Sequence, residues 1–186
     1  MSKKIIFTTG GTGGHIFPAL NLMEHFYSEG YDVLLVTDKR GNKFLENNSN
    51  FKSYILNTST PTSKSFFNKI LSFCKIFFSI IKSLKILKIE KPDLIFGFGG
   101  YVSFPISFLS KFFGIPLIIY ENNMILGRAN KFLSFFSNKI LLEKHIEKGF
   151  PKRYKIKSLK VGPILSKEIF KFSNKVKDYN KENFSI

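Results

Sequence analysis

A run of glycines near the N-terminus is the first feature that indicates chemistry. Residues 8–18 read TTGGTGGHIFP, so four glycines surround Thr12 and a histidine follows them. Glycine permits unusual backbone angles and lets a ligand come close to the main-chain N–H groups. A helix that begins at this point adds a partial positive charge, which favours a phosphate or a diphosphate. A tight turn without a ligand needs only one glycine, so we interpret the segment as a binding loop.

Two further polar or glycine-rich segments occupy equivalent places. Residues 97–105 read GFGGYVSFP, and residues 120–130 read YENNMILGRAN. Each follows an apolar run and precedes a helical pattern, as the first loop does. Ligands of a doubly wound sheet bind at the carboxyl ends of the strands, so the three loops should line one cleft. The candidate substrate-binding residues in these two segments are Gly99, Gly100, Tyr101, Ser103 and Asn130.

The elements that must position these loops alternate along most of the chain. Short apolar runs predict strands at residues 5–8, 33–36, 54–56, 93–96, 117–120 and 139–142. Longer helical patterns cover residues 18–29, 43–47, 64–88, 102–113 and 126–136. Continuous apolar strands joined by helices indicate a parallel sheet that is covered on both faces. The predicted fold class is therefore α/β, with a Rossmann-like doubly wound parallel sheet.

The composition limits the class of protein. The chain has 186 residues, of which 44% are hydrophobic, and this is enough for the core of one domain. Lys and Arg outnumber Asp and Glu by 29 to 13, so the net charge is +16 and anionic partners are favoured. The single cysteine, Cys74, excludes an internal disulfide and a cysteine-based metal cluster. No uncharged apolar stretch reaches the roughly 18 residues of a spanning helix, so we expect a cytosolic protein that can rest on a membrane.

In this order and spacing, the segments GGTGGHIFPAL, GFGGYVSFP and ENNMILGRANK resemble the N-terminal half of the MurG family. The resemblance extends from Lys4 to about Ile169. It implies the N-terminal half of a two-domain GT-B glycosyltransferase, in which this half receives lipid I and the C-terminal half binds UDP-N-acetylglucosamine (UDP-GlcNAc). It also implies transfer of N-acetylglucosamine to lipid I, which forms lipid II for peptidoglycan, with UDP-GlcNAc as donor and no cofactor.

The resemblance assigns roles to individual residues. Four residues are implied to contact the donor or its diphosphate: Thr12, Gly13, Gly14 and Asn123. His15 is implied to be the base that accepts the proton of the attacking sugar hydroxyl in an inverting reaction. A helix N-terminus lowers the pKa of an imidazole and keeps it neutral. Glu121 is the competing base. The structural alternatives are a capping or loop histidine at His15 and a solvated loop carboxylate at Glu121, and no metal is assigned.

The chain departs from the family pattern at two places. Tyr120 precedes Glu121 where the family usually has a histidine. Around Pro163 the family commonly has an asparagine before the proline and an arginine shortly after it, and neither is present here. A donor-phosphate contact is therefore expected to be lost, or to be taken over by Lys167.

Residues 65–88 read SFFNKILSFCKIFFSIIKSLKILK, which combines Phe and Ile with lysines and contains no acid. A helix on a soluble sheet usually buries one stripe and carries charges of both signs outside. Aromatic side chains beside lysines alone suit the boundary of an anionic bilayer, and a broad core stripe is the alternative. The resemblance favours the membrane, because those enzymes are peripheral proteins at the cytoplasmic face of the bacterial cell membrane. The candidate membrane-contact residues are Phe66, Phe67, Lys69, Ile70, Phe73 and Phe77.

Two segments follow from these patterns. Residues 1–170 are predicted to form the domain that faces the acceptor and the membrane, and residues 171–186 a linker and the start of a missing donor-binding domain. The chain is then a fragment of an inverting N-acetylglucosaminyltransferase, which we expect to be inactive alone. Its expected partners are lipid I, UDP-GlcNAc and an anionic membrane surface.

Two other functions stay open. The chain can be the acceptor-binding and membrane-anchoring subunit of a transferase that is split into two polypeptides. It can also be a non-catalytic module that binds an anionic membrane or nucleic acid. We expect no nucleic acid partner, because the lysines interleave with Phe and Ile of buried type instead of forming a solvated basic face.

Overall fold

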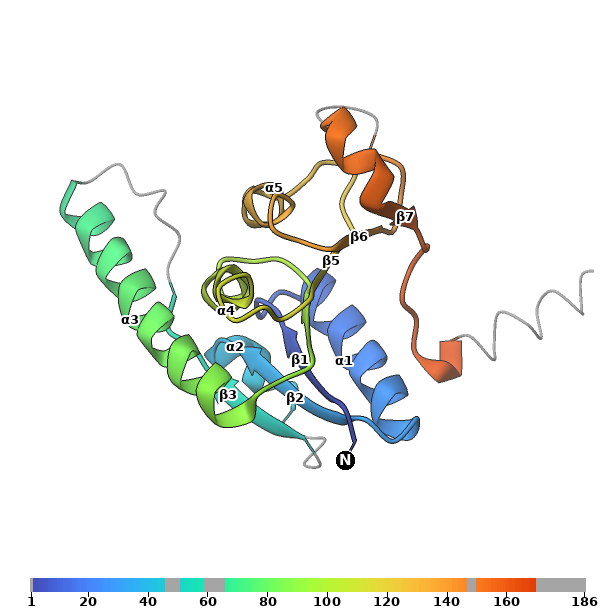
Figure 1. Cartoon of the computed structure of the whole chain (residues 1–186), viewed down its shortest axis with the longest axis horizontal. Helices are drawn as coiled ribbons and strands as arrows, with labels where there is room; N and C mark the ends of the chain where they lie inside the picture. The colour runs from blue at the N-terminus through green and yellow to red at the C-terminus, as the bar shows by residue number, and fades with distance from the viewer. Residues whose placement is uncertain (1, 46–50, 59–65, 147–149, 170–186) are drawn as a thin grey trace, which may run out of the picture.

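One parallel sheet organises the molecule. The computed structural model describes residues 2–45, 51–58, 66–146 and 150–169, so the predicted linker at 171–186 lies outside the described residues. Among the described residues, seven strands form a sheet in the order β3–β2–β1–β4–β5–β6–β7, and every neighbouring pair is parallel (Figure 1). The strands are β1 (Lys4–Thr8), β2 (Asp32–Thr37), β3 (Lys52–Ile55), β4 (Leu94–Gly97), β5 (Leu117–Glu121), β6 (Lys139–Leu142) and β7 (Ser158–Lys160).

Helices cover both faces of this sheet. They are α1 (Gly13–Ser28), α2 (Lys39–Asn42), α3 (Phe66–Glu90), α4 (Ser103–Ser110) and α5 (Arg128–Leu133), with a 3₁₀ helix, η1 (Lys152–Lys157), before β7. In Figure 1, α3, α4 and α5 lie on one side of the sheet and α1 lies on the other. The predicted α/β doubly wound fold is thereby confirmed.

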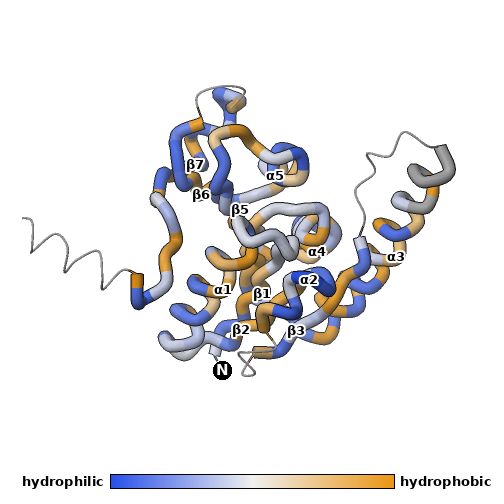
Figure 2. The backbone as a smooth tube through the Cα atoms, turned by 180° about the vertical axis from the view of Figure 1, so that it is seen from behind, coloured by the Kyte–Doolittle hydropathy of each residue, from blue (hydrophilic) through white to orange (hydrophobic). Residues whose placement is uncertain are grey.

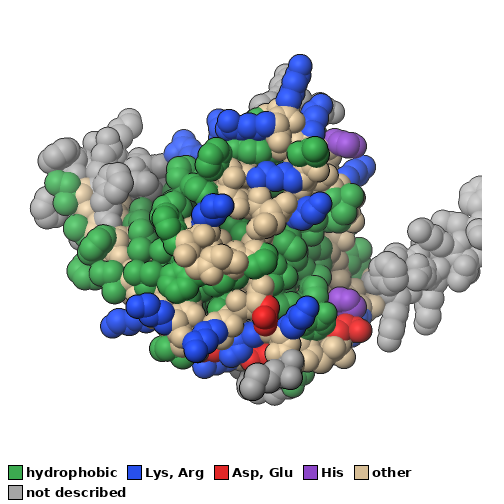
Figure 3. Space-filling view, viewed as in Figure 1, with side chains coloured by type: hydrophobic (Ala, Val, Ile, Leu, Met, Phe, Trp, Pro, Cys, Tyr) green, Lys and Arg blue, Asp and Glu red, His purple; other side chains and the backbone are tan. Residues whose placement is uncertain are grey.

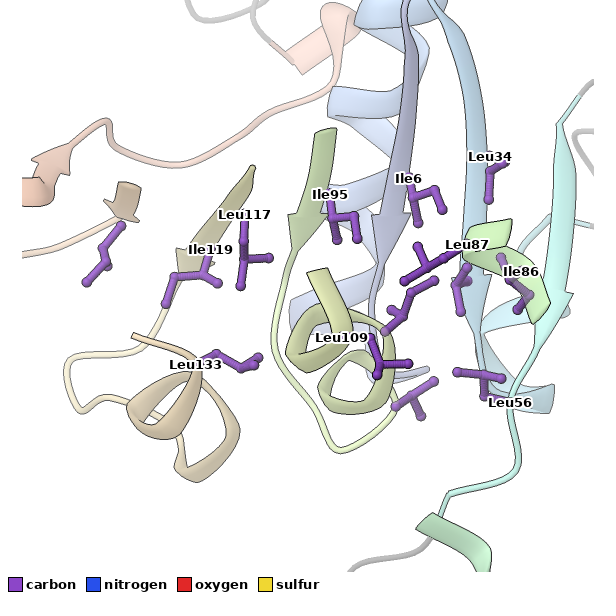
Figure 4. Close-up of a cluster of buried hydrophobic side chains, with 14 of the residues drawn as sticks. Ile6, Leu34, Leu56, Ile86, Leu87, Ile95, Leu109, Leu117, Ile119 and Leu133 are labelled. Carbon is purple, nitrogen blue, oxygen red and sulfur yellow. The ribbon is translucent and has the colours of Figure 1, made fainter. Parts of the chain in front are cut away.

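Two apolar cores explain this layering. Along β1, Ile6 packs with Leu87 and Leu109 on the side of α3, α4 and α5 (Figure 4), whereas Ile5 and Phe7 pack on the side of α1. Because successive strand residues point to opposite faces, an apolar run is needed to supply both cores. Figure 2 shows the apolar central strands and the alternation of apolar and polar residues along α3. Each fully buried Leu, Ile or Phe contributes roughly 1.5–3 kcal/mol of hydrophobic stabilisation.

The structure corrects several predicted boundaries. All six predicted strands exist, but β7 was missed, because its three residues are short of apolar character and largely exposed. Helix α1 begins at Gly13 instead of Pro18, so Pro18 lies inside it. The helix predicted at residues 43–47 is misplaced, because α2 begins at Lys39 and ends at Asn42, and residues 43–45 form turns. The Asp38 carboxylate accepts a hydrogen bond from Gly41 N at 2.9 Å and caps α2 at this earlier point. Residues 46 and 47 lie outside the described residues.

The strand order places the three loops together. The chain moves from β1 outward to β2 and β3, and then returns through α3 to β4 on the other side of β1. The loops after β1 and β4 therefore leave neighbouring strands in opposite senses, which opens a crevice at their carboxyl ends. The loop after β5 lies beside them.

The opposite, amino-terminal edge of the sheet is closed by an ion cluster. The buried Glu90 carboxylate is paired with Lys4 Nζ at 2.8 Å and with Lys52 Nζ at 2.6 Å, and it accepts a hydrogen bond from the Tyr54 hydroxyl. Burial by itself raises the pKa of Glu90, but the hydrogen bonds from Lys4, Lys52 and Tyr54 lower it to about 2. The end of α3 is thereby tied to β1 and β3.

Candidate functional site

The first two glycine loops touch through their backbones. Gly10 N donates a hydrogen bond to Gly99 O at 3.2 Å. A Cβ atom on Gly100 would lie 3.1 Å from Gly10 Cα, which is tighter than ordinary contacts allow. Gly99 and Gly100 also have positive φ angles of 85° and 79°, which favour glycine. Part of the glycine content therefore serves to bring the β1 and β4 loops together.

The remaining glycines of the first loop divide into two kinds. A Cβ atom on Gly11 would lie 2.3 Å from both Asp38 Oδ1 and Gly41 N, so Gly11 is needed for packing against α2. Gly13 and Gly14 instead lie exposed in the first turn of α1. A Cβ atom on Gly13 would meet only the Phe17 ring, at an ordinary 3.5 Å. Gly13 therefore leaves its backbone open to a ligand, whereas a Cβ atom on Gly14 would lie 3.2 Å from Asn122 Nδ2.

The N-terminus of α1 carries no neutralising group of its own. The Thr12 side chain makes no capping hydrogen bond, and the first turn contains no acidic residue. Thr12 O accepts hydrogen bonds from His15 N at 2.9 Å and Ile16 N at 3.0 Å. Within the described part of the chain, the N–H groups of Gly13 and Gly14 have no acceptor. This turn therefore presents two free donors and the positive end of the helix dipole.

A pocket of about 390 Å³ lies beside this turn and is lined by residues of the loops after β4 and β5 and by His15, which directly follows the first glycine loop. Both candidate bases, His15 and Glu121, line it. Of the predicted binding residues, the pocket is lined by Gly99, Gly100, Tyr101, Asn123 and Asn130. The convergence that the sequence predicted for the three loops is confirmed. Residues 127–129 (GRA) also line the pocket; they lie in the third loop segment but are not among the site residues predicted from the sequence.

Four predicted binding residues lie elsewhere. Thr12, Gly13 and Gly14 form the exposed turn next to the pocket and do not line it. Ser103 is buried, and its hydroxyl donates to Gly100 O at 2.9 Å. Ser103 therefore fixes the β4 loop from below instead of facing the pocket.

His15 is half-buried at the start of α1. The Cβ position of Gly99 lies 3.5 Å from His15 Cε1, so the ring packs against the β4 loop. Burial lowers the pKa of His15 below its ordinary value of 6.5, and the negative charge of Glu121 opposes this shift. An imidazole in this position is mostly neutral near pH 7 and can accept a proton.

Glu121 holds the β5–α5 loop in place. Its side chain is buried, and its two oxygens accept four hydrogen bonds. Oε1 accepts from Asn123 N at 3.1 Å and Asn123 Nδ2 at 2.8 Å, and Oε2 accepts from Gly127 N at 2.9 Å and Asn130 Nδ2 at 3.0 Å. The carboxylate thereby organises the residues that line one side of the pocket.

Asn130 is the buried end of this network. Its Nδ2 also donates to Tyr120 O at 3.1 Å, so both amide hydrogens are used. Its Oδ1 is buried without a hydrogen-bond partner among the described residues. The orientation of the amide is therefore fixed by its donors, and one acceptor stays unsatisfied next to the pocket.

The two departures from the family pattern lie away from the pocket. Tyr120 is buried on the side of the sheet that α1 covers. Its hydroxyl can donate a hydrogen bond to Glu143 Oε2, at 3.0 Å, or to Gly162 O, at 3.2 Å. Burial and the hydrogen bond to Glu143 raise the pKa of Tyr120 well above its ordinary value. Lys167 Nζ donates to Ser28 Oγ at 2.9 Å, at the C-terminal end of α1. These contacts tie the segment after β7 to β5 and α1.

The face formed by α3, α4 and α5 carries exposed apolar side chains. Among the predicted membrane residues, Ile70 is 47% and Phe77 is 60% exposed; the side chains of Phe66, Phe67, Lys69 and Phe73 lie outside the described residues. Figure 3 shows a band of hydrophobic side chains across this face with Lys and Arg around it. Near α4 and α5, this apolar surface includes Phe112, Phe132 and Phe135, whose side chains are 69%, 50% and 64% exposed and which are not among the membrane-contact residues predicted from the sequence.

No helix in the described ranges combines the length and the apolar character that crossing a bilayer requires.

Comparison with known proteins gives concordant matches. A profile of the glycosyltransferase family 28 N-terminal domain matches residues 5–142. Two relatives share the name UDP-N-acetylglucosamine--N-acetylmuramyl-(pentapeptide) pyrophosphoryl-undecaprenol N-acetylglucosamine transferase. The relative from Pelagibacter ubique (strain HTCC1062) is 38% identical over 97% of this chain and 49% of its own length. The relative from Wolbachia sp. subsp. Brugia malayi (strain TRS) is 41% identical over 74% of this chain and 37% of its own.

A solved structure agrees with these matches. The crystal structure of Acinetobacter baumannii MurG is similar with a TM-score of 0.74 and 26% sequence identity, over 89% of this chain and 47% of that chain. The chain thus spans about half the length of the relatives that it matches.

Proposed function

The chain belongs to glycosyltransferase family 28, whose N-terminal domain it matches, and on this premise we propose that it is the acceptor-binding half of an N-acetylglucosaminyltransferase. The resemblance to the N-terminal half of the MurG family is confirmed by the relatives of that name. The proposed reaction moves N-acetylglucosamine from UDP-GlcNAc to lipid I and forms lipid II. The proposal uses UDP-GlcNAc as a donor substrate and no cofactor.

The observation that carries this proposal is the convergence of three loops on one pocket that contains a neutral, half-buried imidazole. A hydroxyl of the acceptor sugar attacks the anomeric carbon of the donor, and the bond from that carbon to the UDP oxygen breaks with inversion. The hydroxyl proton goes to His15, and UDP leaves with the bonding electron pair. A positioned general base of this kind contributes roughly 10²–10⁴-fold to the rate.

The geometry favours His15 over Glu121 as this base. Each Glu121 oxygen already accepts two hydrogen bonds, which occupy its lone pairs. Among the described residues, no hydrogen bond occupies the ring nitrogens of His15. A free imidazole nitrogen can take up a proton without breaking an existing network.

The first turn of α1 suits the diphosphate. The unpaired N–H groups of Gly13 and Gly14 and the positive helix end stabilise negative charge that develops on the leaving group. The pocket side of the same turn carries His15. A diphosphate held at this turn therefore lies next to the proposed base.

Transfer of labelled N-acetylglucosamine from UDP-GlcNAc to lipid I tests the proposal. We expect transfer when the chain is fused to the C-terminal half of the Pelagibacter ubique relative, and binding of lipid I by the chain itself. His15→Ala in the fusion should lower kcat by about 10²–10⁴-fold without a change in its unfolding transition. Unchanged turnover removes His15 from this role, and a folded chain that does not bind lipid I refutes the acceptor-binding function.

We also propose that the α3–α4–α5 face rests on an anionic membrane at the cytoplasmic side of the cell. Residues 94–120 and 122–142 contain no Asp or Glu, and Lys111, Arg128 and Lys131 are exposed there. Exposed aromatic rings can enter the boundary of the acyl chains while the cations meet lipid phosphates. This arrangement suits an enzyme whose acceptor is anchored in lipid.

Flotation with vesicles tests this placement. We expect the chain to float with phosphatidylglycerol vesicles and not with phosphatidylcholine vesicles, and to be released by salt. The double variant Phe78→Ser/Phe112→Ser, which changes side chains 68% and 69% exposed, should lose flotation. Tyr27→Ser on α1, 52% exposed on the opposite face, is the matched control. Equal flotation of both variants, or binding to DNA in place of vesicles, contradicts the proposal.

A further inference from the structure

Pro18 creates a gap in the hydrogen bonding of α1. It is the sixth residue of this helix, counted from Gly13. In an uninterrupted α-helix, the N–H of residue 18 donates to the carbonyl of residue 14. Proline has no N–H, so Gly14 O loses its partner within the helix. The gap falls directly beside His15.

Asn122 fills this gap from another part of the chain. Its Nδ2 donates to Gly14 O at 2.6 Å, across 108 residues of sequence. The contact is so close that a Cβ atom on Gly14 would lie 3.2 Å from the same nitrogen. The glycine at position 14 therefore makes room for the Asn122 amide as well as for a ligand.

The other end of the Asn122 side chain joins the pocket network. Asn122 Oδ1 accepts a hydrogen bond from Asn123 Nδ2 at 3.0 Å. The same Asn123 nitrogen donates to Glu121 Oε1 at 2.8 Å, and Glu121 Oε2 accepts from Asn130. A continuous chain of hydrogen bonds thus runs from the first turn of α1 to the β5–α5 loop on the far side of the pocket.

We propose that Asn122 is a positioning residue: by replacing the hydrogen bond that Pro18 removes, it fixes the first turn of α1, and with it His15, against Glu121 and Asn130. The importance of this position for catalysis rests on the proposed function, whereas the positioning itself does not. Asn122 does not line the pocket, so it affects the reaction only through other residues, of which the proposal names His15.

The pair of Pro18 and Asn122 makes a sharp prediction of coupling. If Asn122 replaces the missing N–H, then it should become dispensable once residue 18 has an N–H again. The variant Pro18→Ala supplies this N–H, which can donate to Gly14 O within the helix. The double variant Pro18→Ala/Asn122→Ala should therefore recover what Asn122→Ala alone loses.

The experiment follows His15 by NMR in the isotope-labelled 186-residue chain. In Asn122→Ala we expect the His15 ring to leave its packed position, so that its pKa rises toward the ordinary 6.5 and the Gly13 and Gly14 amide signals shift. In Pro18→Ala, and in the double variant, the titration of His15 should match the parent chain. Asn122→Leu has about the size of the parent side chain without its N–H donors and without a charge that would itself shift the pKa of His15, and it should behave as Asn122→Ala does.

Asn21→Ala is the matched control. Asn21 lies on the same helix, and its Nδ2 donates to Ile164 O at 3.3 Å, away from the pocket. This variant should leave the titration of His15 unchanged. If Asn122→Ala and Asn122→Leu both leave the titration of His15 unchanged, or if the double variant Pro18→Ala/Asn122→Ala does not restore it, the positioning role is refuted.

A transfer assay separates this inference from the proposed function. In the fusion, Asn122→Ala should lower kcat more than it raises KM for lipid I, and the double variant should restore kcat. If the pKa of His15 changes among the parent chain, the two single variants and the double variant as predicted, while kcat stays the same in all four, the positioning role is supported and the catalytic role of His15 is refuted.

Discussion

The Glu90 cluster predicts a specific dependence of stability on pH. The folded-state pKa of Glu90 is about 2, against an ordinary value of 4.5. At 1.36 kcal/mol per pKa unit, the difference of about 2.5 pKa units means that the ionised carboxylate stabilises the folded state by about 3.4 kcal/mol. Because Lys52 is 57% and Lys4 26% exposed, solvent screens part of this interaction, and we expect about 2–3 kcal/mol.

The sign follows from the direction of the shift. The pKa of Glu90 is lower in the folded chain than in the unfolded chain, so the stabilisation is complete above about pH 5. It is lost progressively as the pH falls from 4.5 through 2, because Glu90 is protonated in both states only below its folded-state pKa. Glu90→Gln removes the charge while it retains a carbonyl that can accept a hydrogen bond from Tyr54.

Urea denaturation of the parent chain and of Glu90→Gln isolates this contribution from the other carboxyl groups. At pH 7 we expect the variant to be less stable by about 2–3 kcal/mol, and at pH 3 by clearly less. Asp93→Asn changes an exposed carboxylate that accepts from Lys4 N at 2.7 Å, and it is the control at the same edge. A difference between parent and Glu90→Gln that stays constant from pH 7 to pH 3 would refute the reasoning.

Four further substitutions test contacts within the first and third loop segments, residues 8–18 and 120–130. Gly11→Ala should destabilise the chain by roughly 1–3 kcal/mol, because its Cβ atom would overlap Asp38 and Gly41, and thermal unfolding measures this loss. Gly13→Ala should leave the stability unchanged but weaken the binding of UDP-GlcNAc to the fusion through its diphosphate, which calorimetry measures. Asn130→Asp places a second carboxylate beside Glu121, so it should lower stability by roughly 1–3 kcal/mol at pH 7 and less at pH 4, measured in urea. Tyr120→Phe should cost roughly 1 kcal/mol of stability and leave transfer by the fusion unchanged.

The sheet could be predicted because its signal is local. Strands β1 and β2 are continuous apolar runs, because their side chains contribute to the cores on both faces of the sheet. A short apolar run of this length therefore indicates a buried strand of a parallel sheet. Strand β7 carries no such signal, because it lies at the edge of the sheet and is mostly exposed. The predicted start of α1 is five residues too late, because proline is common in the first turn of helices and Pro18 therefore indicates a helix start. The hydrogen bond that Pro18 removes is replaced by Asn122, which is far away in the sequence, so no local pattern shows that the helix begins earlier.

The position of the candidate site could be predicted from the sequence, but the contacts within it could not. The position of the loops at the carboxyl ends of the strands follows from the α/β rhythm alone. In the sequence, however, Gly11 and Gly13 are equivalent, and only the packing of α2 shows that the first is structural. Likewise, no pattern indicates that Ser103 holds a loop from below, or that Glu121 is occupied by four donors, because those partners are set by tertiary contacts.

The two edges of the sheet differ in how their charges are satisfied, and this difference bears on what binds. At the amino-terminal edge, the charge of Glu90 is matched by two lysines and a hydroxyl. At the carboxyl-terminal edge, the Glu121 carboxylate, which lines the pocket beside the first turn of α1, is already matched by loop donors. That turn contains no acid and no side-chain cap, and Arg128 adds a cation to the pocket lining. An anion can accept hydrogen bonds from the donors of this edge, whereas a ligand without an acceptor leaves them unpaired.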